Sequence, residues 1–215
     1  MLKHALLIGI NYRNTVNALE GPLHDVYKIK ETLVGYDTIV MTDNATLKPT
    51  KQNILTEFKR LLQQKGTLFF YYSGHGVQNP QAIFTLDSVL ITHAEFRSYL
   101  EFMDKESTLV AILDTCFSGN LLDLTYHWAN EWIQSGKPET QGHVYLISSS
   151  HADQLSFDHV VGDEAGGVFT SAYLKEIQHP QTWRSLMEEL TQDVKGQTPM
   201  LSTGQKENID ATFEI

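Results

Sequence analysis

The sequence is poor in cysteine, in basic residues and in long apolar runs, and each shortage excludes a class of protein. Cys116 is the only cysteine among 215 residues, so no internal disulfide can form and a disulfide-stabilised secreted scaffold is excluded. The 16 basic residues face 26 acidic ones, a net charge of −10, and no basic run is present. This balance argues against nucleic acid and anionic membranes as partners and favours a cationic one.

The N-terminal apolar run is far shorter than the roughly 20 residues of a membrane helix. It ends in Asn-Tyr rather than at a small-residue cleavage site, so we expect a cytoplasmic protein. A hydrophobic content of 41% is enough to bury a core, and no repeat or Pro/Ser-rich linker divides the chain. We predict one domain over residues 1–215, with one insertion at 125–142.

Short apolar runs alternate with amphipathic stretches, a pattern typical of buried parallel strands joined by helices. In the first amphipathic stretch, Val26, Ile29 and Leu33 recur on one helical face. The pattern predicts an α/β fold with an open, mostly parallel sheet and helices on both faces. The predicted strands are residues 5–10, 36–42, 67–72, 109–113 and 143–148, and the predicted helices are residues 24–34, 50–64, 166–178 and 182–194.

Reactive side chains follow two of the predicted strands, where ligands bind in such sheets. Ser73-Gly74-His75-Gly76 follows one strand, and Asp114-Thr115-Cys116 ends the next. A thiol nucleophile needs a base and donors for the oxyanion, which a histidine and glycine-flanked amides can supply. A lone cysteine is often a buried small hydrophobe, and such a turn is often only a turn. Their occurrence at one edge of the sheet favours catalysis.

Two segments resemble the catalytic motifs of the metacaspases, in the caspase-like clan of cysteine peptidases: YYSGHG at 71–76 and DTCFSG at 114–119. The resemblance covers nearly the whole chain and is closest to type I metacaspases without their prodomain. Further matching segments are ALLIGINY, LEGPLHD, LLDL at 121–124, SSSHADQLSFD at 148–158, GGVFTSAYL at 166–174 and QTPMLS at 197–202. It implies a caspase-like six-stranded sheet, a large catalytic unit (about 1–124), a connection (125–142) and a small unit (143–215).

The resemblance also implies a cysteine endopeptidase with Cys116 as nucleophile and His75 as general base. The amides of Gly76 and Cys116 would hold the oxyanion, and the chemistry needs no cofactor. The expected partners are peptide or protein substrates with Arg or Lys at P1, the residue before the scissile bond.

Three residues match the acidic S1 pocket that receives such a P1 side chain: Asp25, Ser73 and Asp114. Paired carboxylates suit a guanidinium, because its fork of N–H donors binds them in two-point contacts. Two structural interpretations stay open. Asp25 is also suited to stabilising a helix N-terminus, and Asp114 to forming a turn.

The chain departs from the family at several positions. Pro22 and Phe117 stand where the family often has Cys and His. Thr92 and His93 replace the paired aspartates that help to build an activating calcium site. The remaining acids form only a residual weak calcium candidate: Asp123, with Asp87 and Glu95 nearby. We therefore predict no metal site and activity that is independent of calcium or only weakly dependent on it.

The connection offers a poor site for self-cleavage, because its one basic residue, Lys137, precedes Pro138. We expect a mainly unprocessed monomer that cleaves after Arg or Lys. Two alternatives stay open: a thiol hydrolase restricted to one partner, and a non-catalytic caspase-like binding scaffold. The scaffold interpretation gives no reason to retain both Cys116 and His75.

Overall fold

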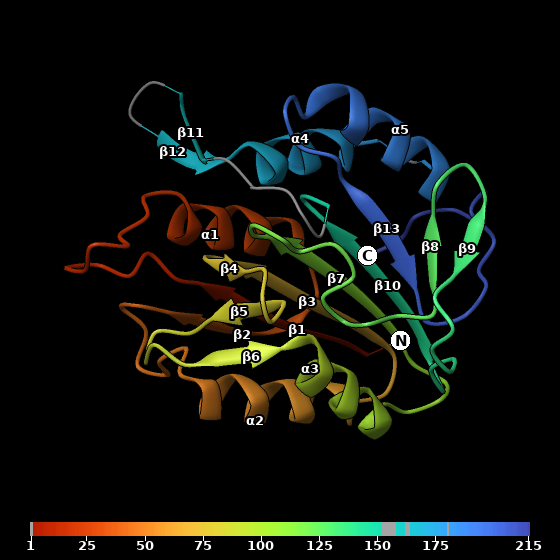
Figure 1. Ribbon diagram of the computed structural model, residues 1–215, viewed down its shortest axis with the longest axis horizontal. Coiled ribbons are helices and arrows are strands. Elements are labelled where there is room, and N and C mark those ends of the chain that lie inside the picture. The colour runs from red at the N-terminus through yellow and green to blue at the C-terminus, as the bar shows by residue number, and fades with distance from the viewer. Residues whose placement is uncertain (1, 152–157, 162–163, 180) are drawn as a thin grey trace.

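A computed structural model describes residues 2–151, 158–161, 164–179 and 181–215 of the chain. Its central sheet has the strand order β2-β1-β3-β7-β10-β13-β8-β9 (Figure 1). Neighbours are parallel from β2 to β10, whereas β13, β8 and β9 each run antiparallel to the strand before them. The strands are β1 (Lys3–Gly9), β2 (Asp37–Thr42), β3 (Thr67–Ser73), β7 (Thr108–Asp114), β8 (Tyr126–Trp128), β9 (Trp132–Gln134), β10 (His143–Ser148) and β13 (Met200–Thr203).

Helices cover both faces of this sheet, so the predicted α/β fold is confirmed. One face carries α1 (Pro22–Thr32), α4 (Val168–Glu176) and α5 (Trp183–Asp193), and the other carries α2 (Lys51–Leu62) and α3 (His93–Tyr99), with a 3-10 turn at Leu100–Phe102 (Figure 1). Because side chains alternate along a strand, each central strand contributes side chains to two hydrophobic cores, one on each face of the sheet. In β3, Phe70 packs toward α2, whereas Phe69 packs with the core beneath α1, α4 and α5.

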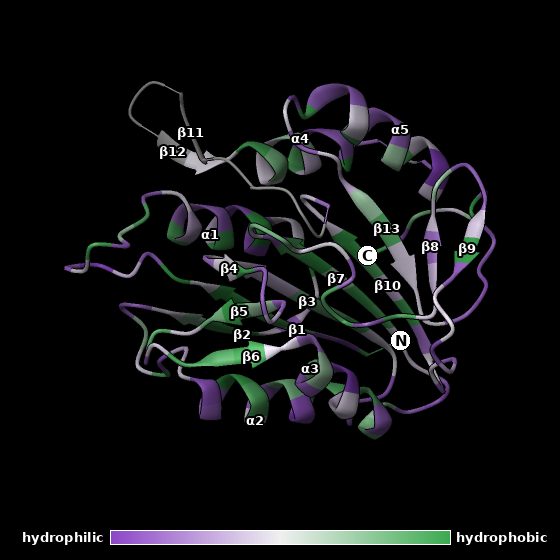
Figure 2. Ribbon diagram, in the orientation of Figure 1, coloured by the Kyte–Doolittle hydropathy of each residue, from purple (hydrophilic) through white to green (hydrophobic). Residues whose placement is uncertain are grey.

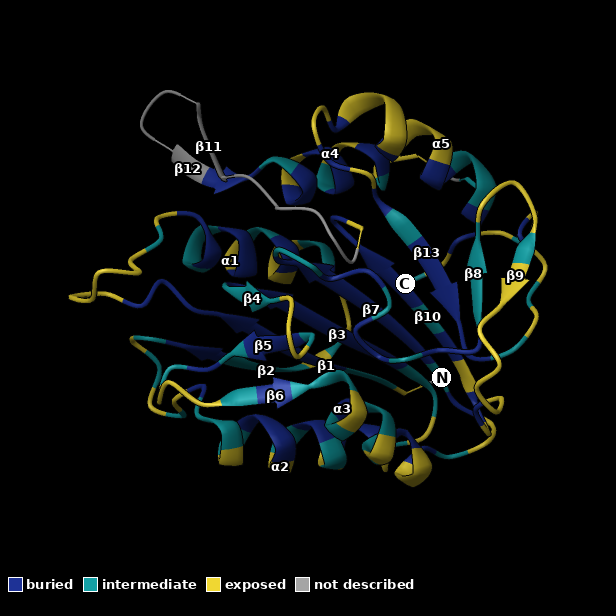
Figure 3. Ribbon diagram, viewed as in Figure 1, coloured by how far each residue is buried: buried dark blue, intermediate teal, exposed yellow. Residues whose placement is uncertain are grey.

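The central strands are apolar and buried, while the helices show polar, exposed outer sides (Figures 2 and 3). This distribution explains why the inner strands β1, β3, β7 and β10 were predictable as apolar runs, whereas β2, the fifth predicted strand, lies at the edge of the sheet and is only partly buried. The first helix begins at Pro22 rather than at residue 24, because proline is well accommodated in the first helical turn. No helix in the described part of the chain has the length and apolar character needed to span a membrane.

The predicted connection at 125–142 is built into the main sheet. Its hairpin β8–β9 pairs with β13 and extends the six expected strands to eight. Two small sheets lie outside: β4 (Gly76–Val77), β5 (Ala82–Phe84) and β6 (Leu90–Thr92), and the pair β11 (Asp158–Val161) and β12 (Glu164–Gly167). Most of the segment at 148–158 that resembles the family lies outside the described residues.

Candidate active site

The pairing of β3 with β7 brings the two family motifs together. Ser73 at the end of β3 is in register with Asp114 at the end of β7. His75 and Cys116 each lie two residues beyond this pair, so they leave the same edge of the sheet on adjacent strands. The Gly74 amide donates to the Asp114 carbonyl at 3.4 Å, which continues the ladder past the strand ends.

Both glycines of the Ser-Gly-His-Gly turn sit where a side chain would not fit. A Cβ at Gly76 would lie 2.0 Å from the carbonyl oxygen of Cys116, so the two turns touch backbone to backbone. A Cβ at Gly74 would lie 2.7 Å and 3.0 Å from the phenolic oxygens of Tyr72 and Tyr12. The glycines therefore permit close contact with the cysteine turn on one side and with two buried phenols on the other.

His75 is half-buried, and its ring is held by the loop that follows β1. Its Nε2 lies 2.7 Å from the Asn17 carbonyl oxygen. A carbonyl only accepts, so Nε2 carries the proton, and in the neutral ring Nδ1 is the basic nitrogen. The Tyr12 ring packs against the imidazole, with centroids 4.8 Å apart.

Cys116 lies in a tightly constrained turn. Phe117, directly after it, has a φ of 57°, which is uncommon for a bulky residue. The Gln81 side chain donates to the Phe117 carbonyl at 2.7 Å. Behind the turn, the Ser149 hydroxyl accepts from the Thr115 amide at 3.1 Å. The turn is thus held from both sides, which fixes where the half-exposed thiol can lie.

The three predicted S1 residues lie together beneath the N-terminus of α4. Asp25 and Asp114 are only 2% and 5% exposed. The Ser73 hydroxyl donates to Asp25 at 3.3 Å. The amide of Gly167, which caps α4, donates to both Asp25 oxygens at 3.2 and 3.0 Å, and a Cβ there would lie 2.1 Å from Asp114. Two carboxyl groups, one from α1 and one from β7, therefore converge on one buried site.

Asp114 also binds the first turn of α4. Its Oδ2 accepts from the Thr170 amide at 3.2 Å and from the Thr170 hydroxyl at 2.6 Å. The Tyr71 hydroxyl lies 2.7 Å from the same Thr170 hydroxyl. Burial, together with the charges of Asp25 and Asp114, raises the pKa of Tyr71 well above its usual value. The acid pair thus concentrates two carboxyl groups in one buried site, where they also accept hydrogen bonds from the N-terminus of α4.

The acids considered for calcium have other partners. Asp123 forms an ion pair with Lys137 at 2.7 Å. Glu95 pairs with Lys51 at 2.5 Å and accepts from the Thr92 amide that it caps. Asp87 accepts from the Thr85 hydroxyl at 2.6 Å and from the Lys51 amide at 3.0 Å.

These contacts leave the acids poorly suited to a calcium ion. Within the described residues, no group of three or more His, Cys, Asp or Glu side chains could hold a metal. Because lysine ammonium groups already neutralise Asp123 and Glu95, the residues do not fit the oxygen-rich cage that Ca²⁺ requires.

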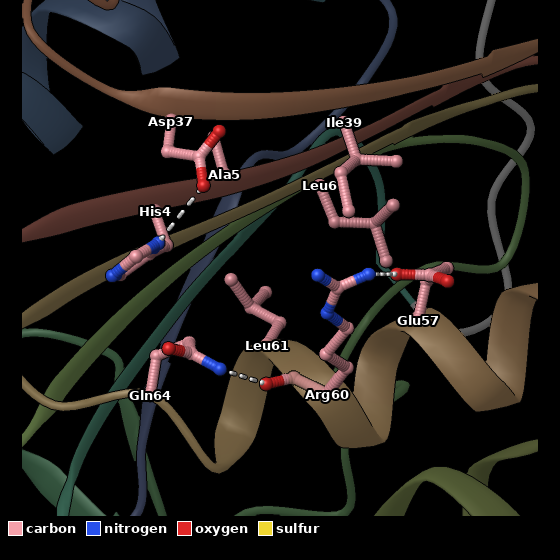
Figure 4. A pocket seen from close by; sticks show the side chains of 9 residues that line it. All are labelled: His4, Ala5, Leu6, Asp37, Ile39, Glu57, Arg60, Leu61 and Gln64. Atoms are coloured by element: carbon pink, nitrogen blue, oxygen red, sulfur yellow. Dashed lines mark hydrogen bonds and ion pairs between the residues drawn. The ribbon is translucent and has the colours of Figure 1, made fainter.

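A separate pocket lies at the opposite ends of the strands. This cavity of about 70 Å³ is formed by β1, β2 and α2, and its charged walls include the pairs His4–Asp37 and Arg60–Glu57 (Figure 4). His4 and Asp37 stand at the amino ends of β1 and β2, whereas Cys116 follows the carboxyl end of β7. The pocket is therefore not part of the candidate active site.

Several residues of the site were missed by sequence reasoning. Tyr12 and Asn17 contact His75, Gln81 holds the cysteine turn, and Gly167 contacts both acids. The Asn-Tyr end of the first apolar run was noted as lacking a cleavage site and as part of a resembling segment, but Tyr12 was given no role in the site. Its position at the carboxyl end of a strand, next to the strand that carries His75, was the available signal.

Comparisons with known proteins give the chain its family. The model of the family Peptidase_C14, described as the caspase domain, matches residues 2–210. Metacaspase-9 of Arabidopsis thaliana is 37% identical over 143 residues, 55% of this chain and 44% of that protein. Metacaspase-1A of Aspergillus niger is 36% identical over 185 residues, 72% of this chain and 46% of that protein. The chain spans less than half the length of these curated relatives.

Solved structures agree on the fold. Protein GSU0716 from Geobacter sulfurreducens superposes with a TM-score of 0.74 at 16% identity, covering 97% of this chain and 95% of its own. Caspase-1 from Spodoptera frugiperda superposes with a TM-score of 0.69 at 10% identity, covering 94% and 86%. The caspase-like fold and the resemblance to metacaspases are both confirmed. The chain belongs to the caspase-domain family of cysteine peptidases and is a homologue of its metacaspases.

Proposed function

We propose that the protein is a cysteine endopeptidase that cleaves after Arg or Lys through a dyad of Cys116 and His75. The observation that carries the proposal is the contact between the two turns: Gly76, next to His75, packs directly on the Cys116 backbone. A thiol and an imidazole on touching turns, at the carboxyl edge of a parallel sheet, are the minimum required for nucleophilic acyl transfer.

In the proposed reaction, the Cys116 sulfur attacks the scissile carbonyl carbon while its proton passes to Nδ1 of His75. The histidine then gives that proton to the leaving amine, the C–N bond breaks, and a thioester remains on Cys116. Water, deprotonated by His75, attacks the thioester, and the thiolate leaves and recovers the proton. The bond from Nε2 to the Asn17 carbonyl supports this assignment, because it leaves Nδ1 as the base.

The amides of Gly76 and Cys116 are proposed as the oxyanion donors. Gly76 pairs with Ile83 in the register of β4 and β5. The Phe84 amide, directly after Ile83, donates to the carbonyl of His75, directly before Gly76. This is the pattern of a non-hydrogen-bonded pair, in which the Gly76 N–H points away from β5. That orientation leaves the amide available to a substrate oxygen.

The preference for Arg or Lys rests on the buried acid pair. Asp25 and Asp114 converge from α1 and β7, and Ser73 adds a hydroxyl at the same level of the sheet. A carboxylate has about four acceptor positions, so hydrogen bonds from α4 and from a P1 guanidinium can be made by the same groups. The acids of this site would also give a binding place to the cationic partner that the net charge favours.

A panel of fluorogenic peptides that differ only at P1 tests the proposed function. We expect cleavage after Arg and Lys, little after Asp, and none by a Cys116→Ala variant. Absence of cleavage on every peptide would favour the alternative of a non-catalytic scaffold. Cleavage confined to one protein partner would favour the restricted thiol hydrolase.

Calcium is expected to have little effect on the activity, because lysines neutralise Asp123 and Glu95. The measurement compares peptidase rates of chelator-treated enzyme with and without millimolar calcium, and the expected ratio is below about two. A Lys137→Gln variant makes the test more sensitive, because it removes the ammonium group that pairs with the Asp123 carboxylate and adds no acid. A tenfold rise for the unaltered enzyme would contradict the proposal.

The connection is expected to stay uncut. Lys137 is engaged by Asp123, and the Pro138 carbonyl accepts from the Thr125 hydroxyl at 2.7 Å and from Arg97. Lys137 and Pro138 are exposed, so the expectation rests on Pro138, which peptidases disfavour directly after the cleavage site, and on these contacts, which hold the segment in place. Intact-mass measurement after prolonged incubation should show one undivided chain, and a product ending at Lys137 would contradict this.

We also propose that the protein is a monomer. The hairpin β8–β9 covers β13, so the outer strand on that side of the sheet, β9, has only three residues, while β2 with six residues forms the other edge. Short outer strands offer little backbone for edge-to-edge pairing with a second copy. The cytoplasmic location stays a prediction from the sequence.

A further inference from the structure

The loop that follows β1 places Tyr12 in direct contact with His75. Tyr12 has a φ of 50° and is only 3% exposed, so its side chain turns inward beneath the Ser-Gly-His-Gly turn. Positive φ is uncommon for an aromatic residue and persists where surrounding contacts require it.

The Tyr12 hydroxyl makes hydrogen bonds to two backbone groups. Its proton goes to the Phe84 carbonyl at 2.5 Å, and its oxygen accepts the His75 N–H at 3.1 Å. The Tyr72 hydroxyl, 3.0 Å from that of Tyr12, lies within donating distance of two carbonyls, those of His75 at 2.9 Å and Phe84 at 3.0 Å. The Tyr12 phenol therefore fixes the N–H of His75 directly, and the Tyr72 phenol lies against the His75 carbonyl.

Both phenols keep their protons over the working range of a peptidase. Burial raises the pKa of Tyr12 to about 12, with the Asp43 carboxylate adding to the effect, and burial also raises the pKa of Tyr72. The same Asp43 carboxylate accepts the amides of Asn11 at 2.7 Å and Arg13 at 3.2 Å, on either side of Tyr12. The loop is thereby anchored to the end of β2.

We infer that Tyr12 is a positioning residue for the general base: its hydroxyl fixes the His75 backbone, and its ring fixes the plane of the imidazole. The ring contact has a tilt of 35° at 4.8 Å. Tyr12 itself touches no reacting atom, so it acts only through His75. This inference rests on the proposed function, because a base needs positioning only if His75 serves as one.

The Tyr12→Phe variant tests the inference, since it removes the hydroxyl and retains the ring. Tyr173→Phe is a matched control, because the Tyr173 hydroxyl is also buried and has no hydrogen-bond partner among the described residues. For each variant, kcat and KM for an Arg peptide are measured, together with the pH dependence of Cys116 alkylation by iodoacetamide. As the only cysteine, Cys116 gives this signal without background.

We expect Tyr12→Phe to lower kcat about tenfold with little change in KM, as a misplaced base would. The pH at which alkylation rises should shift toward that of a His75→Ala reference, near the value of about 8.5 for an ordinary thiol. Tyr173→Phe should match the unaltered protein in both measurements.

The outcomes separate the inference from the function that it rests on. If the unaltered protein alkylates like His75→Ala and cuts no peptide, the proposed dyad fails. If the unaltered protein differs from His75→Ala but Tyr12→Phe keeps the unaltered profile and kcat, only the role of Tyr12 is overturned. A lower unfolding temperature with unchanged kcat and alkylation would also reduce Tyr12 to a structural residue.

Discussion

Cys116→Ala is expected to lower kcat/KM for an Arg peptide by at least about 10⁴-fold, because no other thiol can replace it. His75→Ala should lower the same quantity by roughly 10²- to 10⁴-fold, the range for losing a general base. Both losses are expected mainly in kcat, since neither side chain belongs to the proposed S1 pocket. Steady-state kinetics on one fluorogenic Arg peptide measure both.

The control for this pair is His143→Ala. His143 is a histidine at the amino end of β10 that pairs with Glu207 at 2.8 Å, far from the carboxyl edge of the sheet. Its removal should leave the activity within about twofold, in keeping with the small contribution of an exposed pair. Activity that survives Cys116→Ala would exclude the dyad.

The second large effect is expected from neutralising the acid pair. Asp25→Asn or Asp114→Asn should lower kcat/KM for Arg and Lys peptides about 100-fold, because a buried guanidinium would lose a charged partner. A peptide with Gln at P1 should be cleaved no more slowly than before. The quantity to measure is therefore the ratio of Arg to Gln turnover, which is insensitive to the amount of folded enzyme.

A structural explanation of this result needs its own control, because both acids also bind the start of α4. Thr170→Ala removes the hydroxyl that donates to Asp114 and retains both charges. We expect it to lower the unfolding temperature and to leave the ratio of Arg to Gln turnover unchanged. If Thr170→Ala changes that ratio as much as Asp114→Asn does, the acids act by stabilising α4 and not by binding P1.

The layered fold was predictable because each layer has a local signal. Central strands such as β3 and β7 are buried on both faces, so they appear as unbroken apolar runs, and α2 shows its apolar face at helical spacing. The hairpin β8–β9 lacks such a signal. Its residues 126–134 mix aromatic and polar side chains on a half-exposed edge, where pairing with β13 decides the structure.

The candidate site divides in the same way. His75 and Cys116 could be placed on one edge because parallel strands end together, and Ser73 and Asp114 are indeed in register. The sequence does not indicate which distant backbone groups approach these residues. The Asn17 carbonyl, the Tyr12 hydroxyl and the Gly167 amide reach the site only through tertiary packing. Such contacts leave no periodic pattern in the sequence.

The ion pair between Asp123 and Lys137 is another contact that could not be predicted from the sequence. Both residues were visible in the sequence, one as a residual metal candidate and the other as a doubtful cleavage site. Their ion pair at 2.7 Å joins these two observations. One contact therefore bears on both the expected calcium independence and the expected stability of the connection.

The most direct test of the central claim is the intact mass of the protein after reaction with peptidyl acyloxymethyl ketones, which trap a catalytic thiolate that has bound their P1 side chain. The proposed enzyme should gain one adduct on Cys116 with an Arg probe, little with the matched Asp probe, and none when Cys116 is replaced by alanine. No adduct from the Arg probe under conditions where iodoacetamide still modifies Cys116, or equal labelling by the Asp probe, would contradict it.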